Sequence, residues 1–497
     1  MTPGMPVTAL PRRQIIALCL LRIAEPISFS VLFPFVYFMV QDFHVTDDPR
    51  DVAFYVGLLA STFSFAQLTT GMPWGMVSDR IGRRPVILTG AMATIACSVL
   101  FGLSPSLRWA ILVRLVWGAC NGSVSTAKTI MAELTDETNM ARGFSLLPLC
   151  RNLGTLLGPV IGGLLSRPAD HYPGLFGHSI LFRRFPYLLP CLVCAAIGLC
   201  AWTLAFFLLE ETLPYPRLRT NAAADECRPL LTPTPPPPSL VRPGVLASLV
   251  TAFGSDVRRV LAGVFLSALI SVMLDDIYPV WSATTPGLGG LGLDSRAIGL
   301  TMAFSAGVVL YVQLVVYPRA QRQWGNVCCF RVGALLFGVA SLALPQVATL
   351  ERMVHPLPGG GPVPSLAPLT WLAMVATLVI RVCAGTFGFT SVNMLVSNAV
   401  TDRGCLGVVN GVAQSASSLA RSLGPLIAGS LYSWSLAHSF PFPWDRHLVF
   451  VVMAFVSLAA YAISFTWPLR INHRQFSTLP DPAKALVNAQ GRSLVIV

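Results

Sequence analysis

A dense cluster of charges lies in the stretch Gly75-Met76-Val77-Ser78-Asp79-Arg80-Ile81-Gly82-Arg83-Arg84, which contains three arginines and one aspartate. Two long apolar runs flank it, Val52–Trp74 before it and Pro85–Leu103 after it. Each run is long enough to cross about 30 Å of hydrocarbon as a helix. Because arginine-rich loops remain on the cytosolic side of a membrane, we predict that the stretch forms a short cytosolic loop between two membrane-spanning helices.

The composition of the whole chain also indicates a membrane protein. Hydrophobic residues make up 54% of its 497 positions and charged residues only 11%, whereas soluble domains carry about 25% charged residues. The net charge is +12, and the basic residues are spread over loops and tails, where an anionic membrane surface attracts them. We therefore expect the lipid bilayer as a partner and no nucleic acid. The twelve cysteines lie in or beside apolar runs or in a central loop, and they predict neither a disulfide framework nor a metal site.

Apolar runs of about 18 to 27 residues predict an all-α polytopic membrane protein with twelve spanning helices. An even number of spans places both termini on one side of the membrane. That side carries most of the basic residues, so we expect both termini in the cytosol. The predicted spans are Ile15–Val40, Val52–Trp74, Pro85–Leu103, Leu107–Ile130, Gly143–Ser166, Pro186–Leu209, Val260–Trp281, Ile298–Val316, Val327–Leu344, Leu369–Asn393, Gly407–Tyr432 and Leu448–Trp467.

The chain contains an internal repeat. The segment Leu157–Gly163 recurs as Leu423–Gly429, at an offset of 266 residues (423 − 157), and Thr135-Asp136 recurs at the same offset as Thr401-Asp402. The repeat predicts two pseudo-symmetric halves of six helices each.

A proline-rich segment separates the two copies of the repeat. Its core, residues 233–238, favours extended polyproline geometry and forms no packed core. The segment is interpreted either as a plain tether or as a docking site for a proline-binding partner. The predicted organisation is a first half at 1–209, a cytosolic linker at 210–259, a second half at 260–467 and a cytosolic tail at 468–497.

Three motifs resemble one transporter family. The charged stretch fits the pattern G-x-x-x-D-R-x-G-R-R, and it resembles the signature loop between helices two and three of the major facilitator superfamily. The segment Gly154–Gly163 resembles the fifth-helix motif of its drug:proton antiporters. Glu25-Pro26, Trp74-Gly75 and the segment after Gly158 resemble fungal and plant members related to the zinc-induced facilitators and to tetracycline exporters. The resemblance implies a twelve-helix fold with the substrate path between the halves.

The resemblance also implies roles for the residues of these motifs. The charged stretch is expected to act as a gate, whereas the alternative is a basic loop that only sets topology and needs nothing but arginines. The glycine-rich motif is expected to mark an exporter, whereas the alternative is ordinary close packing of helices. The gating candidates are Gly75, Asp79, Arg80, Gly82, Arg83 and Arg84, and the antiporter-motif residues are Gly154, Gly158, Pro159, Gly162 and Gly163.

Ionisable residues inside predicted spans are candidates for proton coupling, because charges in a bilayer are costly and usually functional. Glu25 is the first candidate to take up and release the coupling proton, and Arg114 would modulate it. Asp275 and Asp276 are the second choice. The alternative is a static ion pair, either Arg22–Glu25 or Glu25–Arg114, that fixes helix packing.

Polar residues within the spans are candidates to face a substrate cavity, although each is also suited to hydrogen bonds between helices. Arg381 is the repeat counterpart of Arg114, at an offset of 267 residues (381 − 114), and Arg151 and Arg421 lie on the fifth and eleventh predicted spans at places that match only approximately. The cavity candidates are Gln67, Asn121, Gln313, Arg381, Asn393 and Gln414.

The predicted function is secondary active transport of a small organic molecule by alternating access. We expect proton-coupled efflux of a drug-like compound or secondary metabolite, with the proton gradient as energy source, no cofactor, no catalytic residues and a monomeric protein. The plasma membrane is the expected location, and the vacuolar membrane is the alternative. Proton-symport uptake of a nutrient, facilitation of a metal or other cation, and a non-transporting sensor on the same fold remain open. The sequence contains no nucleotide-binding P-loop and no paired metal-binding histidines, so these motifs give no support for an enzyme.

Overall fold

The computed structural model describes residues 10–135, 139–212, 254–354, 367–399, 406–438 and 441–472. Every regular element in these ranges is helical. Most of the predicted linker, residues 213–253, and most of the predicted tail, residues 473–497, lie outside the described residues.

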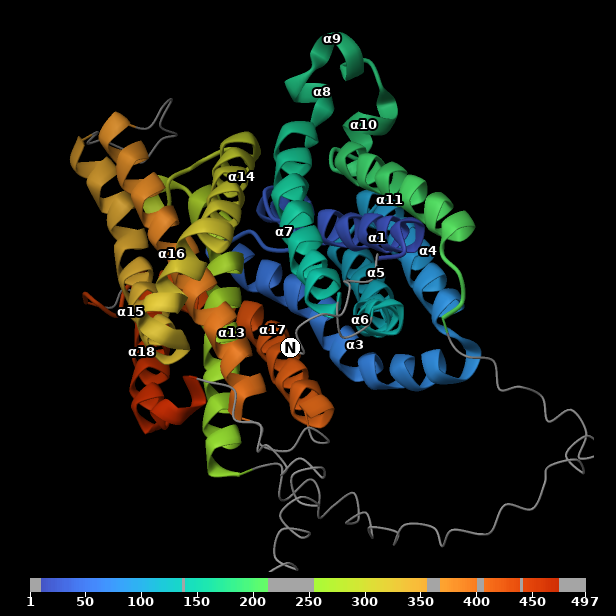
Figure 1. The fold of residues 1–497 in the computed structure, drawn as a ribbon. Coiled ribbons are helices and arrows are strands. Elements are labelled where there is room, and N and C mark those ends of the chain that lie inside the picture. The colour runs from blue at the N-terminus through green and yellow to red at the C-terminus, as the bar shows by residue number, and fades with distance from the viewer. Residues whose placement is uncertain are drawn as a thin grey trace, which may run out of the picture.

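The helices fall into two groups that lie on opposite sides of the molecule (Figure 1). The first half contains α1 (Arg12–Ser30), α2 (Val36–Asp42), α3 (Val52–Ile81), α4 (Arg83–Gly102), α5 (Leu107–Ala119), α6 (Ser123–Leu134), α7 (Met140–Leu165), α8 (Pro168–His171), α9 (Pro173–Phe176), α10 (Ile180–Arg184) and α11 (Leu188–Leu208). The second half contains α13 (Ser255–Ala283), η1 (Pro286–Leu288), α14 (Ser295–Tyr311), η2 (Val312–Val316), α15 (Tyr317–Val354), α16 (Pro368–Ala399), α17 (Leu406–Ala437), α18 (Leu448–Ile463), η4 (Ser464–Thr466) and η5 (Leu469–Asn472).

The long helices make the twelve passes that the sequence predicts. In the first half the passes are α1–α2, α3, α4, α5–α6, α7 and α11, and in the second they are α13, α14–η2, α15, α16, α17 and α18. Seven stretches of the described chain are by themselves long and apolar enough to cross a membrane. The other passes are broken, as α5–α6 is, or carry more polar residues, as α17 does.

Successive passes run in opposite directions, so their connections alternate between two faces. We call these the Asp42 face, at the end of α2, and the Gly82 face, between α3 and α4. The short helices α8, α9 and α10 connect α7 to α11 on the Asp42 face, at the top of Figure 1.

Several predicted boundaries are wrong. The charged stretch is not a loop over most of its length, because α3 continues to Ile81 and only Gly82 leaves the helix. Gly82 has a φ of 106°, a conformation that glycine adopts readily because it lacks a Cβ. The first and fourth predicted spans are each interrupted, at residues 31–35 and 120–122.

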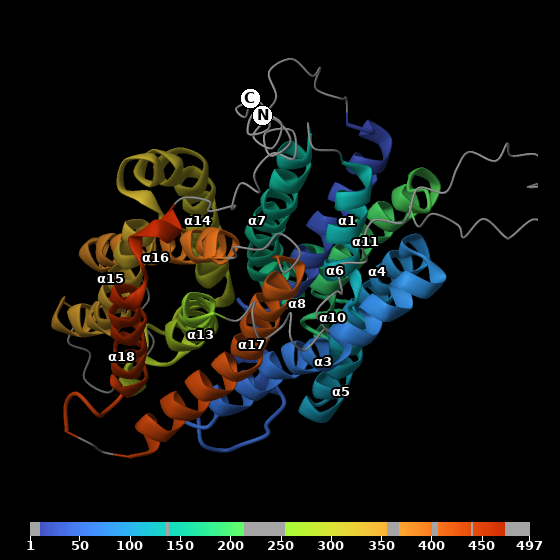
Figure 2. The same ribbon diagram turned by 60° about the horizontal axis from the view of Figure 1, so that its bottom comes forward.

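Two pairs of helices make most of the contact between the halves, α3 with α17 and α7 with α14, and α13 also touches α2 and α3. Figure 2 shows α17 reaching from the second half to lie along α3. Glycines allow the close approach in both pairs, because a Cβ on Gly57 would lie 3.2 Å from Cα of Gly429, and one on Gly163 would lie 2.8 Å from Cα of Gly299. All four lie in the parts of their helices nearer the Asp42 face, so the halves meet tightly toward that face.

Candidate functional site

A cavity of about 880 Å³ lies between the halves. Its volume is within the range of sites for small organic molecules, which is about 300–1,000 Å³. Asn398 and Asn472 place one end of the cavity near the Gly82 face. The charged and amide residues that line it are Arg151, Asn152, Asp275, Gln313, Gln321, Asn326, Arg381, Asn393, Asn398, Arg421 and Asn472.

An ion pair spans one wall of the cavity. Arg381 of α16 contacts Asp275 of α13, with 3.1 Å between Nη2 and Oδ1. The guanidinium of Arg381 also lies over the ring of Tyr278, 5.5 Å from its centroid. This pair neutralises one of the positive charges that face the cavity.

Another wall carries a local irregularity at Gln313. This residue lies in η2, a five-residue π-helix that continues α14. Its side-chain oxygen accepts a hydrogen bond from Asn152 of α7, so the bond joins the two halves across the cavity. Turns of π-helix inside longer helices occur frequently at functional sites.

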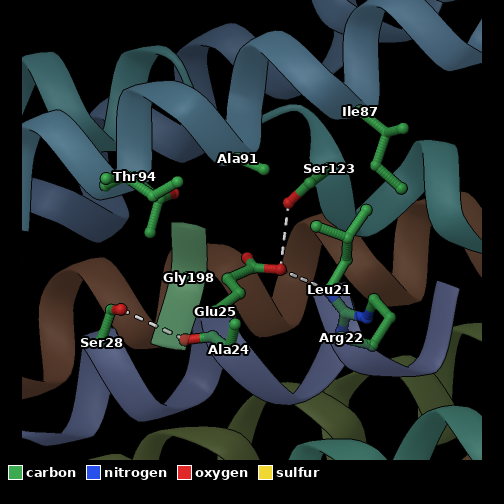
Figure 3. A pocket seen from close by; sticks show the side chains of 11 residues that line it. Leu21, Arg22, Ala24, Glu25, Ser28, Ile87, Ala91, Thr94, Ser123 and Gly198 are labelled. Carbon is green, nitrogen blue, oxygen red and sulfur yellow. Dashed lines mark hydrogen bonds and ion pairs between the residues drawn. The ribbon is translucent and has the colours of Figure 1, made fainter. Parts of the chain in front are cut away.

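Glu25 lies inside the first half, in a separate small cavity of about 20 Å³ (Figure 3). That volume holds about one water molecule. The carboxylate contacts Arg22 at 2.5 Å and accepts hydrogen bonds from Asn121 at 2.8 Å and Ser123 at 3.0 Å. Asn121 and Ser123 are positioned by the break between α5 and α6. Three polar side chains therefore hold this carboxylate.

Arg114 does not contact Glu25. Its guanidinium lies over the rings of Phe29, Phe63 and Trp117, at 5.4, 4.9 and 5.7 Å from their centroids. Nε and Nη1 of Arg114 have no hydrogen-bond partner among the described residues. The carboxylate of Glu25 is instead paired with Arg22, which lies one turn away on the same helix, α1.

Asp276 is instead within electrostatic range of Arg114. The two neighbouring aspartates of α13 thus interact with arginines of opposite halves. Asp275 pairs with Arg381 of the second half, and Asp276 lies near Arg114 of the first. The arginines that the repeat relates to each other therefore each lie near one aspartate of the same helix.

The turn at Gly82 is held by a network of charges within the first half. Arg83 contacts Asp79 at 2.9 Å and Glu133 at 3.1 Å, and it donates to the carbonyl oxygen of Ser78 at 2.7 Å. The carboxylate of Glu211 accepts from the backbone N–H groups of residues 83 and 84, at 2.8 and 3.0 Å. A carboxylate at this position stabilises the N-terminus of α4.

The remaining gating candidates have fewer contacts. Arg84 donates to the carbonyl oxygen of Phe206 at 2.6 Å. Arg80 is exposed and makes no contact with another described side chain, and a Cβ on Gly75 would meet open space. The structure thus concentrates the contacts of this stretch on Gly82 and Arg83.

The antiporter-motif glycines divide between two partners. Added Cβ atoms on Gly154 and Gly158 would overlap α1, and one on Gly162 would overlap Val31 directly after it, so these three allow α7 to pack closely within the first half. Gly163 and the carbonyl of Pro159 face Gly299 of α14 in the second half. The motif therefore serves ordinary helix packing and also the contact between the halves.

Hydrogen bonds reinforce the contact between the halves at the Asp42 face. The hydroxyls of Ser166 and Ser295 are 2.7 Å apart, and Ser433 donates to Asp51 at 3.1 Å. We call these bonds, together with Gly57, Gly163, Gly299 and Gly429, the outer seam. With the seam closed and the cavity extending to the Gly82 face, the cavity lies on the Gly82 side of the seam.

The predicted cavity residues are only partly brought together. Gln313, Arg381 and Asn393 line the large cavity, whereas Asn121 binds Glu25 and Gln414 accepts a hydrogen bond from Lys128 at 3.3 Å. Gln67 is not among the lining residues. Arg151 and Arg421 also line the cavity, although neither is among the predicted cavity residues. Their position inside apolar spans was the signal available, because buried charges are rarely incidental.

The comparison with protein families matches residues 18–425 to the model described as the Major Facilitator Superfamily. The chain belongs to the major facilitator superfamily. The multidrug transporter mfsB of Aspergillus fumigatus, a member by its name, is 31% identical over 494 residues, covering 86% of this chain and 80% of mfsB.

A plant relative agrees with this assignment, and a solved structure shares the fold. Protein ZINC INDUCED FACILITATOR-LIKE 1 of Arabidopsis thaliana is 31% identical over 432 residues, covering 87% of this chain and 85% of its own. The solved D-xylose–proton symporter has a similar fold, with a TM-score of 0.67 at 15% identity, over 94% of this chain and all of that one. The predicted fold and family are confirmed, and the chain is an integral multi-pass membrane transporter.

Proposed function

We propose that this transporter exports a small organic molecule by proton-coupled alternating access. The large cavity between the halves carries the proposal, because it is the space into which a substrate fits. In the described conformation the outer seam is closed, so a substrate enters from the Gly82 side. Opening the seam while closing the opposite end would release it on the Asp42 side.

The proposed orientation places the Gly82 face in the cytosol. Three arginines, Arg80, Arg83 and Arg84, lie within two residues of the turn at Gly82, and basic residues favour the cytosolic side. Both termini then lie in the cytosol, and the described state is open to the cytosol. This is the state in which an exporter loads its cargo.

The direction of transport rests on similarity. mfsB is named as a multidrug transporter, and the motif in α7 resembles that of drug:proton antiporters. The fold does not decide the direction, because a proton symporter has a similar one. Export is therefore the proposal, and proton-driven uptake is the outcome that would replace it.

Glu25 is the proposed proton site. Its carboxylate lies in a polar cage next to a space for about one water molecule, which suits proton uptake and release. Glu25 is also within electrostatic range of Arg151, which lines the substrate cavity. Arg151 is therefore the proposed electrostatic link between Glu25 and the cavity.

The test uses the purified full-length protein in proteoliposomes of known orientation, with a pH-sensitive dye inside. A panel of organic anions, cations and neutral metabolites is added, and native protein is compared with Glu25→Gln. We expect substrate-triggered proton flux opposite to substrate movement, lost in the Glu25→Gln variant, which keeps the size of the side chain but removes its charge and one of its two acceptor oxygens. Substrate exchange without a proton gradient should persist in that variant.

Each other result has a distinct meaning. Proton flux in the same direction as the substrate would overturn export by antiport in favour of uptake. Antiport that survives in Glu25→Gln would remove Glu25 from proton coupling, and Asp275→Asn would then be the next variant. No proton flux with any transported compound would overturn proton coupling altogether.

A further inference from the structure

We propose that the large cavity binds an organic anion, whose carboxylate or phosphate group is held by Arg151 and Arg421. The inference rests on the proposed transport function and specifies its substrate class. It is carried by the charges that line the cavity, three arginines and one aspartate, which leave a net charge of +2.

The arginines are not equivalent. Arg381 is paired with Asp275 at 3.1 Å, so its charge is already neutralised. The side chain of Arg151 has no hydrogen-bond or ion-pair partner among the described residues, although Asp275 and Glu25 lie within electrostatic range of it. Arg421 donates only to Ser418 of its own helix, at 2.8 Å. Guanidinium groups pair well with carboxylates and phosphates, because their N–H groups match the geometry of these anions. Arg151 and Arg421 therefore present the unsatisfied charge of the cavity.

The two arginines come from opposite halves, Arg151 from α7 and Arg421 from α17. They lie within electrostatic range of each other, and Lys128 of α6 lies within range of both. Like charges repel strongly where water is partly excluded, so the two arginines oppose a closer approach of α7 and α17 across the cavity. An anion bound between the arginines would remove the repulsion and attract both halves. Closure would then depend on the substrate.

The other side chains that line the cavity indicate what the uncharged part of the anion is like. Apolar side chains such as Phe337, Phe389 and Val272 alternate with amides such as Asn152 and Asn393. A flat or aliphatic body with some polar groups fits such a wall. An inorganic ion alone would leave most of the cavity unfilled.

The test compares two dyes with similar xanthene bodies and opposite charges, the anion fluorescein and the cation rhodamine 123. Binding to the full-length protein is measured at pH 7.5 in nanodiscs of neutral phosphatidylcholine. We expect fluorescein to bind at least about tenfold more tightly than rhodamine 123. Arg151→Gln and Arg421→Gln should each weaken fluorescein binding about tenfold, and the lysine variants should restore part of the loss.

The matched control is Arg322→Gln, which removes one exposed positive charge near the Gly82 face and outside the cavity lining. It should leave fluorescein binding unchanged. Equal losses in the control and in the cavity variants would overturn the site, as would tighter binding of rhodamine 123. Nanodiscs with anionic phospholipid provide a further comparison, and complete displacement of fluorescein by the lipid would reassign the arginines to a lipid headgroup.

Binding is measured without a proton gradient, so the result is independent of the coupling experiment. If the anion does not bind but other compounds drive proton antiport, the substrate class is wrong and the proposed function stands. If the anion binds through both arginines but no compound drives proton movement, the anion site stands and proton-coupled export fails.

Discussion

Replacing Gly57 by leucine is expected to abolish transport. Gly57 lies on α3 where α17 approaches most closely, and a Cβ there would overlap the carbonyl oxygen of Pro425 and lie 3.2 Å from Cα of Gly429. These are backbone atoms, which have no rotamer to move away. An overlap of this kind costs about 3 kcal/mol, enough to shift an equilibrium between two conformations by about 100-fold. The outer seam would then stay open.

Cross-linking gives a direct readout of the seam. Ser166→Cys and Ser295→Cys, introduced together, place two thiols where the native hydroxyls are 2.7 Å apart. Oxidative cross-linking should be efficient in the otherwise native chain and should fall sharply when Gly57→Leu is added. Transport in proteoliposomes should fall with it, because a transporter that cannot close its outer seam does not complete the cycle.

Gly71→Leu is the matched control. Gly71 lies on the same helix, and a Cβ there would meet nothing within 4 Å. The two variants make the same change in helix propensity, which favours leucine over glycine. Near-native transport by Gly71→Leu assigns the loss in Gly57→Leu to the seam. Equal loss in both variants would show that the seam is not the cause, and so would undiminished cross-linking in Gly57→Leu.

The sequence predicted part of this seam through the internal repeat. Gly163 and Gly429 are related by the offset of 266 residues (429 − 163), and the structure places each at a contact between the halves, against α14 and α3 respectively. Length and hydrophobicity of the runs were enough to predict twelve passes, because crossing a bilayer requires a minimum apolar length. These are properties of single segments or of repeated ones, and they can be read along the chain.

The candidate site could be predicted only in part. Which side of a helix faces the cavity depends on how neighbouring helices pack, so the apolar spans gave no reason to place Arg151 and Arg421 together. The partners of Glu25 were missed for a related reason. Asn121 and Ser123 reach its carboxylate because the fourth pass breaks at residues 120–122, whereas the hydrophobic pattern predicted one continuous helix. The turn-forming sequence Asn121-Gly122-Ser123 was the local sign of that break.

The second large effect is expected at the Gly82 turn, where Arg83→Ala should lower both stability and transport. Arg83 is 8% exposed and bridges Asp79, Glu133 and the carbonyl of Ser78. Removing it leaves these acceptors without their cationic partner. The side chain of Asp79 is 70% exposed, so water can replace Arg83 as its hydrogen-bond donor. The lost interaction energy therefore comes mainly from Glu133 and the carbonyl of Ser78. We expect the free energy of unfolding to fall by about 2–3 kcal/mol and the transport rate to fall at least about tenfold.

The Arg80→Ala variant distinguishes the effect of losing the contacts of Arg83 from the effect of losing one positive charge. It removes the same charge from the same stretch, but Arg80 is exposed and contacts no other described side chain. A substitution of this kind changes stability by about 0.5 kcal/mol or less. Thermal unfolding in detergent and transport in proteoliposomes should therefore remain near native for Arg80→Ala and fall for Arg83→Ala. If the two variants lose transport equally, the arginines act only as positive charges that set the orientation of the helices. If only Arg83→Ala fails, the stretch works through the contacts that fold its turn, because both proteins keep the same net charge on that face.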